Sequence, residues 1–202
     1  MHQSSLGTVM LLAGPRLHPL WHTPMIPLLF LISCLAMGYA VVVAESGFSS
    51  RVFGRPAHRP MLASLSKVMV WVLLAFAVIR VVDLVARGKT ALMFAFDIYS
   101  IMFLVEMALV AWAAFSLARI GPSAPLGSLV QTAFVILLVG TLYRFDTYLL
   151  AFQPGGNWSY FPAIPEILIT LGVIAVEVLL YIFIVKKFPI LAGYGSGVRG
   201  SL

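Results

Sequence analysis

The chain has 202 residues, of which 61% are hydrophobic and only 10% are charged, and its formal net charge is +6. Typical soluble domains carry about 25% charged residues, so this chain has too few charges to cover a water-soluble surface of its size. Its basic residues are sparse and separated by long apolar runs, which excludes the clustered basic surface of a nucleic-acid-binding protein. We predict a multi-pass integral membrane protein of the all-α class.

Residues 1–26 form the first predicted segment, which is too polar and too often interrupted by proline to span a bilayer. The segment is either a docking surface for a partner or a cap that touches only lipid headgroups. His18 and His22 are four residues apart, but Pro19 lies between them and Pro24 follows. We therefore favour polar loop residues over a helical pair of metal ligands.

Five apolar stretches follow, at residues 27–45, 65–86, 99–118, 128–150 and 164–184. A bilayer core of about 30 Å needs roughly 20 apolar residues in a helix, and each stretch approaches or exceeds that length. The period-two alternation of a membrane barrel is absent. The sequence predicts a transmembrane region of five helices within residues 27–187, packed as a bundle, followed by a cytoplasmic tail at residues 188–202.

The distribution of lysine and arginine predicts the orientation, because these residues are enriched in cytoplasmic loops. If the N-terminus lies outside, eight of them are at the inner face: Arg51, Arg55, Arg59, Lys67, Arg119, Lys186, Lys187 and Arg199. Only Arg16, Arg87 and Lys89 then lie outside. We predict that the N-terminus is outside and the C-terminus inside.

One group of charged residues is predicted near the outer face: Arg80, Asp83, Asp97, Arg144, Asp146 and Glu166. A charge at the centre of a transmembrane helix costs about 2.5–3.5 kcal/mol on insertion scales, so each needs a partner. Arg80 and Asp83 are three residues apart and can pair on one helical face, whereas Arg144 and Asp146 point in different directions. This outer polar cluster is either a set of interhelical salt bridges or a polar chamber for a headgroup or for protons.

Three acids form a second group: Glu45, Glu106 and Glu177. No lysine or arginine lies within one helical turn of them along the sequence. Lipid favours the neutral acid, and such a group can load and release a proton. We predict a proton-transfer role for these three acids. The alternative is a protonated glutamate that holds neighbouring helices together by hydrogen bonds.

Histidine and cysteine positions bear on cofactors. His2, His18, His22 and His58 all lie outside the five predicted spans, whereas a b-type haem in a bundle normally takes histidine ligands from spanning helices. Cys34 is the single cysteine, and no phosphate-binding loop, Ser/His/Asp set or zinc spacing is present. We expect no haem, no bound metal and no self-contained catalytic site in this chain.

Several sequence blocks, in order along the chain, resemble the integral membrane subunit of hydrogenase-2-type nickel–iron hydrogenases, in the NrfD/polysulfide-reductase membrane-subunit superfamily. The blocks are MHQSSLGTVMLLAG, HPLW, GYAVVVAES, YRFDTYLLAFQPGG, YFPAIPE and LGVIAVEVLLYIFIVKKFPIL. The resemblance extends over essentially the whole chain but covers only the C-terminal half of the family pattern. We expect the chain to be the C-terminal part of a longer protein or a truncated gene model.

The resemblance implies a multi-pass subunit of the bacterial inner membrane that passes electrons from a periplasmic iron–sulfur subunit, and the nickel–iron subunits behind it, to menaquinone or ubiquinone. It implies that the segment containing His2, Gln3, Ser4, Ser5, His18 and Trp21 faces the iron–sulfur subunit or the quinone. It also implies that Glu45 serves proton movement and that Arg144 and Glu166 belong to the outer polar cluster.

Other functions stay open at this point. The chain could instead be the membrane subunit of a molybdenum-type, polysulfide-reductase-like oxidoreductase, or a purely structural anchor. A small transporter is disfavoured, because no predicted span is split near its middle by paired glycine or proline breaks.

Overall fold

The computed structural model describes residues 2–53, 59–121, 124–153, 155 and 162–188, and all of its regular elements are helices. The α-helices are α1 (His2–Leu12), α2 (Ile26–Phe53), α3 (Arg59–Ala86), α4 (Ile98–Ala118), α5 (Leu126–Phe145) and α6 (Ile164–Lys187). Short 3-10 turns lie at Gly14–Arg16 and Thr90–Phe94, and a π-helical turn at Asp146–Leu150 continues α5. The all-α prediction is confirmed.

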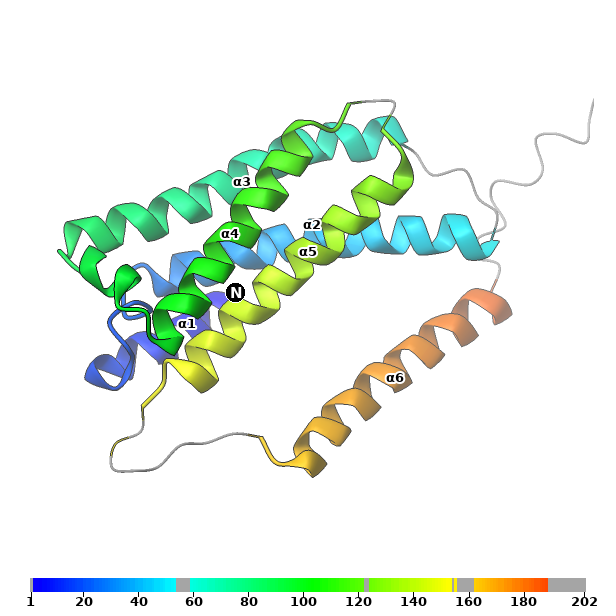
Figure 1. Ribbon diagram of the computed structural model, residues 1–202. Coiled ribbons are helices and arrows are strands. Elements are labelled where there is room, and N and C mark those ends of the chain that lie inside the picture. Colours follow the sequence, from blue (N-terminus) through cyan, green and yellow to red (C-terminus); the bar gives the residue numbers. More distant parts are fainter. Residues whose placement is uncertain (1, 54–58, 122–123, 154, 156–161, 189–202) are drawn as a thin grey trace, which may run out of the picture. The chain divides into compact units, whose positions relative to one another are not determined.

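Four helices pack in a ring: α2 contacts α3 and α5, and α4 contacts α3 and α5 (Figure 1). Large apolar side chains fill the space between them, among them Phe30, Phe76, Phe103 and Ile136, each at most 3% exposed. Helix α1 lies against α2. Helix α6 belongs to a separate compact unit, residues 160–202, and is described by itself.

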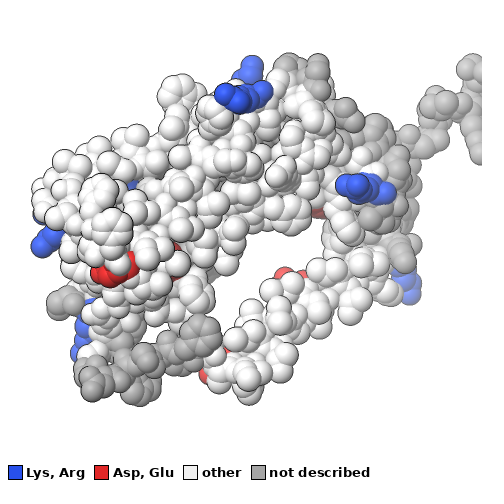
Figure 2. Space-filling model, in the orientation of Figure 1, with Lys and Arg blue, Asp and Glu red and all other residues white. Residues whose placement is uncertain are grey.

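Within the described residues, five helices are long and apolar enough to cross a membrane: Ile26–Arg51, Pro60–Ala86, Ile98–Ala118, Leu126–Leu150 and Ile164–Val185. The outward side chains of the four-helix ring are also apolar, as at Leu35, Val78, Phe115 and Phe134. Figure 2 shows few charged side chains on the face in view. The predicted number of spans is confirmed, and the chain is a multi-pass membrane protein.

At one end of the bundle two helices extend beyond the predicted spans. Helix α2 continues to Phe53, so Glu45 lies within the helix and does not close it. Helix α3 already begins at Arg59, six residues before the predicted span. Both extensions contain polar residues and fall outside the predicted apolar runs. Pro60 is in the first turn of α3, where a helix tolerates proline.

Helices α2 and α5 approach closely because each offers a glycine to the other. A side chain at Gly47 on α2 would collide with Val130 of α5, and one at Gly140 on α5 would collide with Met37 of α2. Small residues at helix crossings are how membrane helices gain close packing. This contact fixes the α2–α5 spacing along much of the bundle.

Helix ends at one side of the bundle carry clear stop and start signals. The Ser100 N–H donates to Asp97 Oδ1 at 2.7 Å, so Asp97 caps the N-terminus of α4. Helix α3 ends at Ala86 and is followed by Gly88, whose φ of 66° favours glycine, with the Lys89 N–H donating to Leu84 O at 3.1 Å.

We call residues 13–25 together with residues 146–153 the cap, because these two segments join at that same side of the bundle. Leu17 and Phe152 form an antiparallel bridge. The His18 N–H donates to Ala151 O at 2.8 Å, and the Gln153 N–H donates to Arg16 O at 2.7 Å. The N-terminal segment is therefore fastened to the end of α5 by backbone hydrogen bonds.

Candidate functional site: a buried charge cluster beneath the cap

A charged cluster lies in the bundle interior, where the bundle meets the cap. Arg80 on α3, Glu106 on α4 and Asp146 in the π-helical turn are 3%, 0% and 2% exposed. Arg80 Nη2 and Glu106 Oε2 are 3.4 Å apart, and Asp146 interacts electrostatically with Arg80. Three different segments thus supply one guanidinium and two buried carboxyl groups to the cluster.

Four aromatic rings surround the Arg80 guanidinium. Its Cζ lies 4.9 Å from the Tyr143 ring centroid, 5.0 Å from Phe103, and 5.9 Å from both Trp21 and Phe76. A cation over aromatic faces gains about 2 kcal/mol or more where water is excluded. The rings therefore stabilise the charge of Arg80 whichever carboxylate balances it.

The cluster holds several polar atoms that have no hydrogen-bond partner within the described residues: Arg80 Nε and Nη1, Glu106 Oε1, Trp21 Nε1 and Tyr143 OH. Buried polar groups in proteins are normally bonded to protein or to ordered water. The set contains donors (Arg80 Nε and Nη1, Trp21 Nε1), an acceptor (Glu106 Oε1) and a hydroxyl that can be either (Tyr143 OH), so the cluster is polar on several sides of the guanidinium.

Arg87 ties the cap to α3. Its Nε donates to Asp83 Oδ2 at 2.8 Å, and its Nη1 donates to Pro19 O at 2.9 Å and to His22 O. The predicted Arg80–Asp83 pair is therefore wrong: Arg80 turns inward to Glu106, and Asp83 pairs with Arg87 one turn further along. The i,i+4 spacing of Asp83 and Arg87 was the signal for this pair.

Replacing Arg87 with alanine is expected to loosen the cap. The change removes charge-assisted hydrogen bonds to two carbonyl oxygens. For a partly exposed group, their loss lowers the stability of the closed cap by about 1–2 kcal/mol. Hydrogen–deuterium exchange of amides in residues 17–26 should accelerate about tenfold in the Arg87→Ala protein. The control Arg119→Ala removes an exposed arginine that stacks on Phe115 of α4 and should leave these amides unchanged. Equal acceleration in both variants would contradict the assignment.

His18 is held in the cap by its ring. The imidazole stacks on Tyr99 with 4.2 Å between centroids and an 8° interplanar angle. Burial lowers the pKa of His18, and the charge of nearby Asp97 partly offsets that effect. The neutral imidazole is therefore favoured around neutral pH, and its Nδ1 accepts the Leu20 N–H at 3.4 Å.

The remaining members of the predicted outer polar cluster separate in the structure. Arg144 faces α2, where its Nη1 lies 3.1 Å from Met37 Sδ, and it also donates to Gly140 O. Asp97 caps α4. Glu166 lies in the first turn of α6, in the second unit, so its membership of the cluster stays a prediction.

The three predicted proton-transfer acids also differ in their surroundings. Glu106 is paired with Arg80, so the interpretation of it as an acid without a neighbouring cation is wrong, since sequence distance says nothing of a partner on another helix. Glu45 is an exposed residue of α2, and Glu177 lies on α6. The proton roles of Glu45 and Glu177 stay predictions.

The residues predicted to face a partner or the quinone also differ in their burial. Trp21 is 1% exposed and packs edge-on against Phe103, so it offers no surface to a partner here. Ser4 and Ser5 lie on α1, and His18 is half-buried in the cap. The side chains of His2 and Gln3 lie outside the described residues.

The sequence reasoning missed the aromatic surround of Arg80, formed by Trp21, Phe76, Phe103 and Tyr143. Phe76 and Arg80 are four residues apart on α3, and Phe103 and Glu106 are three apart on α4, so each pair shares a helical face. This spacing was the available signal for part of the surround. Trp21 has no such signal, because a loop brings it in.

Comparison with known proteins finds two relatives. A protein of Escherichia coli (strain K12) named "Probable Ni/Fe-hydrogenase 2 b-type cytochrome subunit" is 34% identical over 194 residues, which are 95% of the chain and 50% of that protein. A protein of Nitratidesulfovibrio vulgaris (strain Hildenborough), named only "Protein", is 28% identical over 202 residues, 95% of the chain and 51% of its own length. The chain thus spans about half the length of these relatives. No family model and no solved structure matches it.

These findings correct two expectations. The likeness to a nickel–iron hydrogenase subunit is supported, but that relative is named a b-type cytochrome subunit, which replaces the expected NrfD-type quinone subunit; the comparisons do not show the NrfD superfamily. The same name points to haem and contradicts the expectation that none is involved.

The described residues themselves fit a haem poorly. His18 and His22 both lie in the cap, and α2 to α6 carry no histidine in their described residues. No group of three or more histidine, cysteine or acidic side chains could hold a metal within the described part of the chain. A haem bound by the longer relative would therefore need ligands from outside these helices, and no step below passes through one.

Proposed function

We propose that this chain is part of the membrane subunit of a nickel–iron hydrogenase complex, which passes electrons from an iron–sulfur partner at the cap side to membrane quinone. The similarity to a hydrogenase subunit supports the complex. The observation that carries the role of this chain is the buried cluster of one arginine and two carboxyl groups. Reduction of a quinone consumes two electrons and two protons, and a membrane-embedded site needs groups that hold those protons.

The charge balance of the cluster gives it that ability. If Glu106 and Asp146 were both ionised, the cluster would carry one negative charge beyond what Arg80 balances. Uncompensated buried charge costs several kcal/mol, so one proton shared by the two acids is the favoured state. The surround of aromatic rings stabilises Arg80 in either arrangement, which lets the proton move between the acids. Glu45 and Glu177 are further acids of the proposed path.

The orientation in this proposal has the cap outside. At the other end of the bundle, Arg51, Lys67 and Arg119 are exposed cations, in agreement with the enrichment of lysine and arginine on the cytoplasmic side. The cap would then meet the iron–sulfur partner in the periplasm of a bacterial inner membrane.

A carboxyl-to-amide substitution tests the proton role. In the purified complex, Glu106→Gln should lower hydrogen-dependent reduction of a soluble quinone at least about tenfold, because general acid–base groups contribute about 10²–10⁴-fold. Hydrogen-dependent reduction of an artificial dye, which bypasses the membrane subunit, should stay within about twofold. Glu45→Gln is expected to act in the same direction.

The matched control is Asp83→Asn, which makes the same carboxyl-to-amide change on α3 outside the cluster, where the carboxylate pairs with Arg87. It should leave both rates near those of the unmodified complex. If Glu106→Gln lowers the quinone and dye reactions equally, or neither, the chain acts as a structural anchor and the proposal fails.

A further inference from the structure

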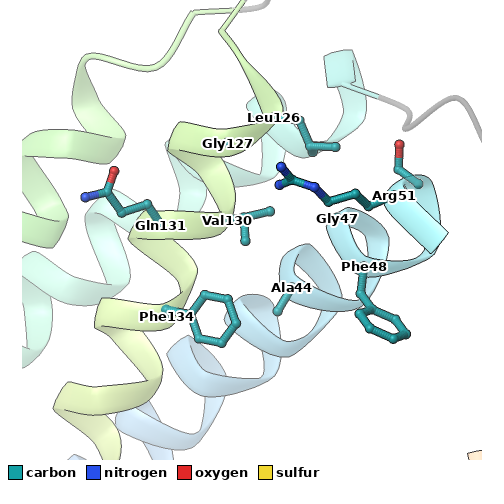
Figure 3. A pocket seen from close by; sticks show the side chains of 10 residues that line it. Ala44, Gly47, Phe48, Arg51, Leu126, Gly127, Val130, Gln131 and Phe134 are labelled. Atoms are coloured by element: carbon teal, nitrogen blue, oxygen red, sulfur yellow. The ribbon is translucent and has the colours of Figure 1, made fainter.

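A groove between α2 and α5 lies at the end of the bundle away from the cap. It has a volume of about 740 Å³, within the range of small-molecule sites. Its walls are mostly apolar: Ala44, Gly47 and Phe48 come from α2, and Leu126, Val130 and Phe134 from α5. Figure 3 shows these side chains on the two facing helices.

Among the described residues that line this groove, Arg51 is the single cation. In Figure 3 the Arg51 guanidinium extends from α2 toward Leu126 and Gly127 at the start of α5. Arg51 is the last residue of its candidate membrane span, and Leu126 is the first residue of the facing span. The charge is therefore at the level of the lipid headgroups, and the apolar walls lie deeper.

The groove extends along the helices toward the bilayer centre. Ala44 lies seven residues before Arg51 on α2, and Phe134 lies eight residues after Leu126 on α5. At 1.5 Å per residue, the lining covers about 10–12 Å of depth. An occupant needs a negative group at the membrane surface and a flexible hydrocarbon part below it.

We infer that this groove binds an anionic phospholipid of the surrounding bilayer, with its phosphate at Arg51 and an acyl chain between α2 and α5. The charge of Arg51 at the groove mouth selects the headgroup, whereas Lys67 and Arg119, exposed cations at the same end of the bundle, do not line the groove. Basic pockets between helices on this side of a membrane bind anionic headgroups. This site is independent of the buried cluster that carries the proposed function.

Native mass spectrometry of the purified protein, titrated in detergent with phosphatidylglycerol or phosphatidylcholine, tests the inference. The unmodified protein should bind phosphatidylglycerol at least about fivefold more tightly. Arg51→Gln should remove this preference, and Arg119→Gln, which removes one positive charge at the same end but outside the groove lining, should keep it.

A second variant tests the acyl-chain position. A side chain at Gly127 would meet no atom within 4 Å, so Gly127→Leu should reduce the free space of the groove without displacing either helix. It should weaken the binding of both lipids by about tenfold. Equal binding of the two lipids by the unmodified protein would overturn the inference, as would displacement of the lipid by inorganic phosphate alone or by a quinone analogue at equal concentration.

Discussion

Replacing Arg80 with leucine is expected to lower the melting temperature of the detergent-solubilised protein by about 10 °C. Arg80 is 3% exposed and balances Glu106 in the bundle interior. Removal of one partner of a buried ion pair costs about 3–5 kcal/mol, because the other charge stays buried without compensation. The loss of the cation from the four surrounding rings adds to the effect.

The double variant Arg80→Leu/Glu106→Leu separates this cause from simple loss of packing. It removes both charges and should recover more than half of the lost stability, as apolar replacements of buried ion pairs often do. The control Lys67→Leu removes an exposed cation from the same helix and should shift the melting temperature by less than about 2 °C. If the double variant were no more stable than Arg80→Leu, the instability of Arg80→Leu would not come from the uncompensated charge of Glu106.

Replacing Trp21 with alanine is expected to lower the melting temperature by about as much as Arg80→Leu does. The side chain is 1% exposed and lies edge-on to Phe103, with 6.2 Å between ring centroids. Truncation of a buried tryptophan costs about 3–5 kcal/mol, since it removes apolar contacts and leaves a cavity. The cap segment should detach earlier than the bundle when the variant is heated.

Trp71 provides the matched control, because it is the same residue type but 73% exposed on α3. Trp71→Ala should change the melting temperature of the protein in detergent by less than about 2 °C. If Trp21→Ala left stability unchanged and only weakened binding to the iron–sulfur partner, Trp21 would be a docking residue, as the sequence reasoning predicted, and its burial would have no energetic weight.

The spans could be predicted from sequence because lipid imposes a simple rule on composition. Runs such as residues 99–118 and 164–184 have no alternative to a helix in a bilayer, and the structure forms α4 and α6 there. The extensions at Arg51 and Arg59 were missed because they leave the apolar region, where hydropathy no longer indicates structure.

The charge cluster could be predicted only in part. The sequence identified Arg80, Glu106 and Asp146 as costly residues that need an explanation. It could not identify their partners, because the Arg80–Glu106 contact joins residues 26 positions apart on different helices. Their spacing along the helix favoured a salt bridge between Arg80 and Asp83. In the structure Asp83 instead pairs with Arg87, and Arg80 points into the bundle interior.

The bond network of Arg87 also sets an order of assembly during synthesis. Pro19 and His22 leave the ribosome well before Arg87, because His22 precedes it by 65 residues. The hydrogen bonds from Arg87 to these carbonyl groups can therefore form only after α2 and α3 have both been inserted. We therefore expect the cap to close late in biogenesis, and we expect a chain that fails to insert α3 to keep residues 13–25 accessible to proteases.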